Sequence, residues 1–245
     1  MQNLICATLL TGAYDVNRNQ TLAHNNFKLI EKWYESIVNL KLNGIVFHNA
    51  FSNETVRKYQ NQSVNFIKVD YHHPLNTNTY RYVVYQKFLN DNAHQIANVF
   101  FTDITDVEVV LNPFVAPLFL NNKDFLFCGD EPKILQNEWM QNHCTHLRNN
   151  IKDFSDFENE NASKTLLNCG IFGGNFAVMQ KLVNQLANLH LTYTVTNTTA
   201  YTLDMGAFNY LARTHFKNYL LHGAPINTEF KKMESLRNNC WFRHK

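Results

Sequence analysis

The feature that most constrains the fold is an apolar run, Ala97 to Phe101, followed closely by two aspartates, Asp103 and Asp106. A run of this length predicts a strand buried on both faces of a sheet. In open α/β sheets, ligands bind just beyond the carboxyl ends of the strands. Two carboxylates there suit a hard divalent cation, which in turn neutralises a diphosphate. Asp also commonly caps the turn after a strand, so both roles stay open.

Strands and helices alternate through the first half of the chain. Apolar runs predict strands over residues 4–10, 45–47 and 64–69. Apolar residues at helical spacing predict an amphipathic helix from about residue 21 to 41, and a second helix around 82–89 leads into the acidic strand. This alternation is typical of an α/β fold with a mostly parallel central sheet flanked by helices.

The second half of the chain is less regular. Its apolar segments predict strands over 125–128, 166–172 and 219–221, and helices over 176–189 and 204–214. The polar stretch 136–163 predicts a loop or short helices rather than core. No internal repeat or clear linker interrupts the sequence, so we expect a single domain over 1–245.

The net charge and the cysteine content indicate which kinds of partner and which cellular compartment to expect. A formal net charge of +2 gives no support for a nucleic-acid partner. The apolar run 4–10 is too short to span a membrane, so we expect no membrane segment in this chain. Five cysteines without C-x-x-C spacing predict reduced thiols and a cytoplasmic protein.

Five short motifs follow one another along nearly the whole chain. They are Thr11-x-x-Tyr14, residues 101–107, residues 168–174, Asp204-x-x-x-Phe208-Asn209, and His222-Gly223 with a closing His244-Lys245. Their order resembles the GT-A fold of nucleotide-sugar glycosyltransferases. The resemblance implies a Rossmann-like domain with a nucleotide-binding half over 1–110 and an acceptor-binding half over 111–245. It also implies transfer of a sugar from a nucleoside-diphosphate sugar, with UDP favoured, to a glycan or another hydroxyl acceptor.

The acidic loop departs from the usual Asp-x-Asp of this superfamily, because Thr105 stands where the second aspartate would be. We predict Asp106 as a metal ligand, with Asp103 on the metal or on the donor ribose. The resemblance adds His244, since a late histidine often binds the metal in these enzymes. Mn²⁺ accepts an imidazole more readily than Mg²⁺ does, so we expect Mn²⁺, or else Mg²⁺, as cofactor.

The resemblance assigns four further residues to the nucleotide. Thr11 and Tyr14 would meet the base, and Arg81 would lie near the nucleotide or brace the acidic loop. Lys245 would offset charge on the departing diphosphate, as a compact ammonium can. The structural alternatives are a tyrosine packed in the core, an exposed arginine on a helix and a frayed chain end.

The segment 168–174 would pass close to the donor sugar or the acceptor. Asn168 would offer an amide to sugar hydroxyls, and Gly170, Gly173 and Gly174 would permit a close backbone approach. An ordinary turn before a helix also explains the glycines.

Inversion at the anomeric carbon requires a carboxylate that takes the acceptor proton. The resemblance directs Asp204 towards the acceptor, which makes it the first candidate; Asp130 and Glu131, at the end of another predicted strand, are the second. Asp204 also suits an N-cap. Retention of configuration requires no such base, so both stereochemical outcomes stay open.

Other functions fit the motifs less well. Phosphoryl transfer through an aspartyl nucleophile would place its loop early in the chain, and nucleotidyl transfer would need a Gly-rich, Arg-containing loop in place of residues 11–15. A non-catalytic nucleotide- or sugar-binding module on the same fold stays open because the acidic motif is altered.

Overall fold

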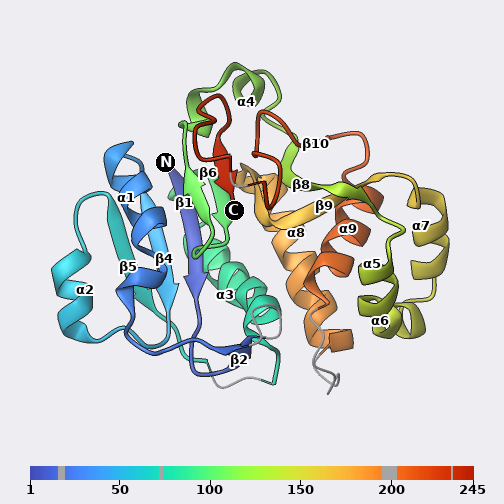
Figure 1. Ribbon diagram of the computed structural model, residues 1–245, viewed down its shortest axis with the longest axis horizontal. Helices are drawn as coiled ribbons and strands as arrows, with labels where there is room; N and C mark the ends of the chain where they lie inside the picture. The colour runs from blue at the N-terminus through green and yellow to red at the C-terminus, as the bar shows by residue number, and fades with distance from the viewer. Residues whose placement is uncertain (16–19, 72–73, 195–202, 233) are drawn as a thin grey trace.

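The computed structural model describes residues 1–15, 20–71, 74–194, 203–232 and 234–245. Its main feature is a seven-stranded sheet in the order β10-β8-β9-β6-β1-β4-β5 (Figure 1). β6, β1, β4 and β5 run parallel to one another, and β9 is antiparallel to both of its neighbours. This arrangement confirms the predicted α/β fold with a mostly parallel central sheet.

The strands of the described residues are β1 Gln2–Leu9, β2 Tyr14–Asp15, β3 Gln20–Thr21, β4 Gly44–His48, β5 Val64–Lys68, β6 Ile96–Thr102, β7 Val107–Val109, β8 Leu126–Ile134, β9 Thr165–Asn175, β10 Leu220–His222 and β11 Phe242–His244. The helices are η1 Phe27–Leu29, α1 Glu31–Asn39, α2 Asn53–Tyr59, α3 Thr77–Asp91, η2 Pro113–Val115, α4 Pro117–Asn121, α5 Glu138–His143, α6 Thr145–Asn150, α7 Phe154–Asn161, α8 Phe176–Leu189, η3 His190–Thr194 and α9 Asp204–His215.

The sheet separates two apolar cores, because successive residues of a strand face opposite sides. On one side Phe101 of β6 stacks on Tyr85 of α3, with ring centroids 4.0 Å apart. The same core contains the buried faces of α8 and α9. On the other side Phe100 packs against Phe242 of β11 at 5.3 Å, in a core shared with Trp33 of α1.

A small second sheet holds the end of the chain in place. β11 pairs antiparallel with β7, directly after the acidic loop. Trp241 and Phe242 are buried in the core, which argues against the frayed chain end considered above. Neither short strand was predicted from the sequence, since three residues carry too little periodicity.

The first amphipathic helix is shorter than predicted. Three elements occupy the range 21–41 in which a single helix was expected. They are the end of strand β3 at Gln20–Thr21, a 3₁₀ turn at Phe27–Leu29 and α1 at Glu31–Asn39. Asn25 adopts a left-handed backbone with φ of 53°, and the side chain of Asn26 caps the 3₁₀ turn. These two asparagines interrupt the helix. Phe27 still stacks on Tyr59, with ring centroids 3.4 Å apart.

The polar stretch 136–163 contains the short helices that we predicted, but the expectation that it contributes little to the core was wrong. Each of α5, α6 and α7 buries apolar side chains in the core that also contains residues of α9 and β9, including Met140, Leu147 and Phe154. Short helices present too few turns for an apolar stripe to stand out from the surrounding Asn, Asp and Glu.

Two strands extend beyond their predicted ends. β8 continues past Gly129 to Ile134, with irregular register after Cys128 and after Asp130. β9 continues through Gly173 and Gly174 to Asn175, so these glycines lie within the sheet and not in a loop.

All five cysteines are buried free thiols. Across the described residues, no helix combines the length and apolar character that crossing a membrane requires.

Candidate active site

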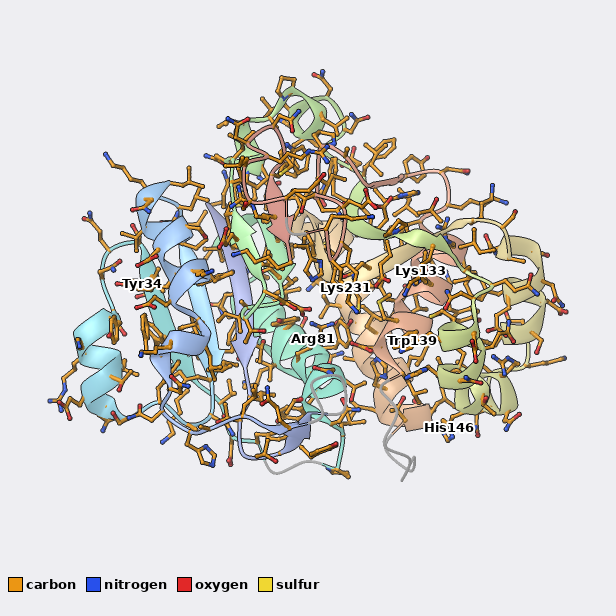
Figure 2. All side chains as sticks on the ribbon, viewed as in Figure 1. Tyr34, Arg81, Lys133, Trp139, His146 and Lys231 are labelled. Carbon is orange, nitrogen blue, oxygen red and sulfur yellow. The ribbon has the colours of Figure 1, made fainter. Side chains whose placement is uncertain are left out.

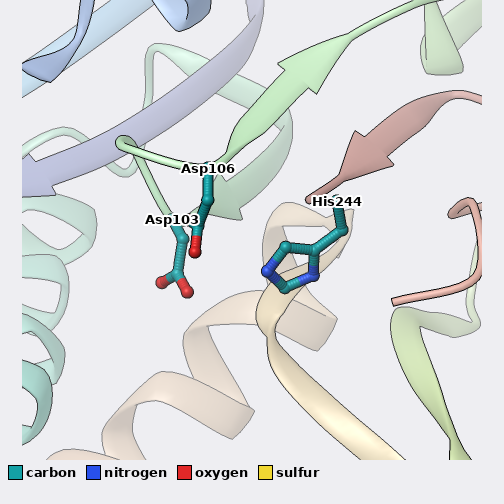
Figure 3. A group of neighbouring side chains, drawn as sticks. All are labelled: Asp103, Asp106 and His244. Atoms are coloured by element: carbon teal, nitrogen blue, oxygen red, sulfur yellow. The ribbon is translucent and has the colours of Figure 1, made fainter. Parts of the chain in front are cut away.

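Strand pairing brings the end of the chain to the acidic loop. β6 ends at Thr102, and β11 runs beside β7 with His244 opposite Val107. The backbone N–H of Lys245 donates to the carbonyl of Asp106 at 2.9 Å. One ligand atom from each of Asp103, Asp106 and His244 lies within 4.8 Å of the other two (Figure 3). These three residues, which we call the triad, are the ligands predicted from sequence.

The triad fits a divalent cation. A β-carbon on Gly170 would come within 2.7 Å of both Asp103 Oδ2 and His244 Cε1, so glycine leaves room that any other residue would fill. The backbone N–H of Asp103 donates to the Gly170 carbonyl at 2.7 Å, which holds the two segments together. His244 is 2% exposed, and its ring packs against Phe230. Two carboxylates and a fixed imidazole form a donor set that suits Mn²⁺.

Behind the triad lies a buried polar group, which we call the Arg81 network. Arg81 of α3 donates through one terminal nitrogen to Asp103, and through the other to Asp204 Oδ2 at 3.3 Å. The thiol of Cys169 also donates to Asp204 Oδ2, at 3.5 Å. The Arg81 guanidinium thus links the acidic loop to the start of α9.

Asp204 is an unusual carboxylate. Burial raises the pKa of its carboxyl, and the nearby Arg81 guanidinium opposes that rise. Asp204 Oδ1 is buried and has no hydrogen-bond partner among the described residues. A buried acceptor without a partner is costly, and such atoms are typical of sites that bind a substrate.

A second chain of hydrogen bonds orders the segment around Gly170. Asn168 Oδ1 accepts from the Gly170 N–H at 2.6 Å, and Asn168 Nδ2 donates to Glu131 Oε1 at 2.9 Å. Glu131 is 8% exposed, and its Oε2 lies 3.7 Å from Lys133 Nζ. The structure thus brings Asn168 and Glu131 together beside the triad.

All these groups line one cavity of about 370 Å³. Its lining residues come from both halves of the chain and are Asn78, Arg81, Asp103, Asp106, Glu131, Lys133, Trp139, His143, Asn168, Cys169, Gly170, Asp204, Met205, Phe230, Lys231 and His244. Figure 2 shows Arg81, Lys133, Trp139 and Lys231 gathered in the middle of the molecule. A smaller hollow of about 50 Å³ shares Asn78, Arg81 and Asp103 with this cavity.

Several lining residues were missed from the sequence. Trp139 and His143 lie in the polar stretch 136–163, and Lys133 and Lys231 belong to no motif. Their placement depends on the extension of β8 and on the turn before β11. The spacing of Trp139 and His143, four residues apart on a helix, is the one signal that pairs two of them.

Thr11 and Tyr14 lie outside the cavity. The Thr11 hydroxyl lies 2.9 Å from His24 Nδ1 and 3.4 Å from Asn49 Oδ1, so it is held within the protein. Tyr14 is 52% exposed on β2, which excludes a tyrosine packed in the core. Leu10, just before them in the chain, lines the small hollow.

Gly173, Gly174 and Lys245 also lie outside the cavity. A β-carbon on Gly173 would meet the Phe100 ring at 2.3 Å, and one on Gly174 would meet the Phe125 carbonyl at 2.8 Å. Sheet packing therefore explains both glycines. The ammonium of Lys245 pairs with Glu108 of β7, beside the pair that Arg243 makes with the same carboxylate.

Comparisons with known proteins inform the fold. Neither protein-family models nor curated protein sequences match the chain. Among solved structures, the galactosyltransferase LgtC in complex with donor and acceptor sugar analogues matches with 12% identity and a TM-score of 0.50, over 99% of this chain and 86% of LgtC. An active-site mutant of LgtC matches with 13% identity and a TM-score of 0.51 over the same shares. The chain therefore has the GT-A glycosyltransferase fold that its motifs resemble.

Proposed function

We propose that the protein is a metal-dependent glycosyltransferase that moves a sugar from a nucleoside-diphosphate sugar, with UDP favoured, to a hydroxyl acceptor. The observation that carries this proposal is the triad, set in a cavity at the carboxyl end of β6 in a GT-A sheet. Mn²⁺ is the preferred cofactor and Mg²⁺ the second, because the donor set includes an imidazole.

We propose that the nucleoside lies against the small hollow beside Arg81, which encloses only part of it. It is lined by residues of β1, by Leu10, by the start of α3 and by the acidic loop, and it opens next to Asp103. A nucleotide there has its diphosphate at the triad and its sugar towards Asp204. Thr11 and Tyr14 follow Leu10 in the chain, and we retain them as candidates for contacts to the base.

In the transfer step, the bond from the anomeric carbon to the diphosphate oxygen breaks and a bond from the acceptor oxygen to that carbon forms. A cation at the triad would supply charge neutralisation to the leaving diphosphate. Lys231 is the cavity lysine without a carboxylate within ion-pair distance among the described residues, and its neighbour Phe230 packs on His244. We assign to Lys231 the role in charge compensation that the motif suggested for Lys245.

Asp204 is the proposed base. Its Oδ1 is available to accept the proton of the acceptor hydroxyl when configuration inverts, and its raised pKa makes it a stronger base than an ordinary aspartate. Glu131 is the second candidate, but its Oε1 already accepts a hydrogen bond from Asn168.

A thermal-shift screen tests the proposal. UDP, GDP, ADP and the corresponding nucleotide sugars are added with and without Mn²⁺, and release of nucleoside diphosphate is followed in parallel. A ligand at a hundred times its Kd stabilises the fold by about 2.7 kcal/mol. We expect UDP and UDP-sugars to stabilise only with the cation, and UDP to be released. Binding without turnover would favour a non-catalytic module, and no nucleotide binding would refute the proposal.

A further inference from the structure

The part of the cavity lining that is not shared with the small hollow includes two aromatic side chains. Trp139 and His143, both on α5, stack with ring centroids 3.8 Å apart and an interplanar angle of 19°. His143 Nδ1 donates to the Trp139 carbonyl at 2.7 Å, since a carbonyl only accepts. Burial lowers the pKa of His143, which keeps the imidazole neutral against the indole. The pair, which we call the aromatic wall, is therefore held in one orientation.

The aromatic wall stands beside polar groups that can bind hydroxyls. Glu131 and Lys133 line the same cavity from β8, and the Lys133 side chain is about half exposed. Their contact of 3.7 Å is longer than an N⁺–H···O⁻ hydrogen bond, so each retains capacity for a ligand. One carboxylate accepts hydrogen bonds and one ammonium donates them, which matches neighbouring hydroxyls that do both.

The position of this surface relative to the donor argues for the acceptor. The small hollow, the triad and the Arg81 network account for nucleoside, diphosphate and transferred sugar under the proposed function. Trp139, His143 and Lys133 line the cavity but not the small hollow. Trp139 also packs on the core. Its ring is half-buried and still lines the cavity, among residues that are mostly polar.

We propose that the aromatic wall, with Glu131 and Lys133, is the acceptor subsite and that it takes a pyranose ring of a glycan. The C–H groups of a sugar ring carry partial positive charge and pack on the negative face of an aromatic ring, while its hydroxyls reach Glu131 and Lys133. A peptide hydroxyl presents no such ring. This inference rests on the proposed function and specifies its acceptor class.

Ligand-observed saturation-transfer NMR tests the subsite. The full chain is mixed with an excess of UDP and Mg²⁺. Mg²⁺ replaces Mn²⁺ because Mn²⁺ is paramagnetic and broadens NMR signals. Methyl β-galactoside, methyl β-glucoside or a serine-containing peptide is then titrated in. We expect at least one glycoside to bind and the peptide not to bind. Trp139→Ala should weaken glycoside binding about tenfold, and Trp139→Phe should restore most of it.

Two further variants guard the test against a folding defect. Lys133→Met alters a half-exposed side chain and should weaken glycoside binding about fivefold. Tyr219→Ala removes an exposed aromatic ring just before β10, outside the cavity lining, and should leave binding unchanged. Equal glycoside affinity in the wild type, Trp139→Ala and Lys133→Met would overturn the inference, as would binding of the peptide in place of both glycosides. Absent UDP binding in the wild type would count instead against the proposed function.

Discussion

Asp103 and Asp204 share the guanidinium of Arg81 but lie in different environments. The Asp103 side chain is 31% exposed and belongs to the triad, whereas Asp204 is 5% exposed and belongs to the Arg81 network. Burial leaves Asp204 dependent on Arg81 for its charge, because water contributes little there. Asp103 keeps contact with solvent and with two further ligand groups. One cavity thus combines a solvent-accessible anionic site, which suits a cation, with the buried Asp204 carboxylate, whose negative charge Arg81 compensates.

The largest effect should follow from removing a triad ligand. Asp106→Ala leaves two ligand groups, so we expect Mn²⁺-dependent UDP affinity to fall by more than about a hundredfold. Isothermal titration calorimetry measures the affinity, and circular dichroism checks the fold. Asp156→Ala, on the exposed side of α7, is the control and should bind as the wild type. Unchanged affinity in Asp106→Ala would show that the triad does not hold the metal.

The next effect concerns the other carboxylate. Asp204→Asn removes a base while keeping size and hydrogen bonding, so kcat should fall by about a thousandfold with UDP affinity retained. Protonation also removes the base, so wild-type turnover falls as pH drops through the pKa of Asp204. Because burial raises that pKa above the ordinary 3.8, the acid limb of the kcat profile should lie above pH 3.8. A kcat within threefold of the wild type would exclude the base role of Asp204 and leave Glu131 as the base or a mechanism with retention of configuration.

Arg81 should matter more for folding than an exposed arginine does. Arg81→Leu leaves the Asp204 carboxylate buried without its counter-charge, which should cost about 3 to 5 kcal/mol in the free energy of unfolding. Urea denaturation measures this cost. The loss should shrink on acidification, because a protonated Asp204 needs no counter-charge.

A matched arginine provides the control. Arg148 pairs with Glu158 at 2.6 Å but keeps 24% of its side chain exposed, so Arg148→Leu should cost about 1 kcal/mol or less. If both variants lose the same stability at pH 7, the contrast between the buried and the open carboxylate does not hold.

The smallest effect separates two lysines. Lys231→Gln should weaken Mn²⁺–UDP binding about fivefold, since it removes from the cavity a cation that makes no ion pair among the described residues. Lys245→Gln breaks an ion pair with Glu108 outside the cavity and should change UDP affinity by less than about twofold. Titration calorimetry compares the two. A larger loss in Lys245→Gln would restore the role that the motif suggested.

Local patterns determined much of the fold and part of the site. The apolar runs that form β1, β4, β5 and β6, and the periodic stripe of α8, act within a few neighbouring residues, so the sequence alone predicts them. The strand-end aspartates were found for the same reason. His244 entered through the resemblance, and the pairing of β11 with β7 is what carries it to Asp106.

Tertiary structure alone decided the rest of the cavity. Gly173 and Gly174 look like loop glycines, yet Phe100 and Phe125 from neighbouring strands require them. Trp139 and Lys133 reach the cavity because β8 extends past its predicted end and α5 buries Met140 in the core. Neither feature leaves a periodic signal in the sequence. The aspartates at the strand end could therefore be predicted from the sequence, whereas the aromatic wall could not. A pattern reports on neighbours along the chain, and a cavity is made by neighbours in space.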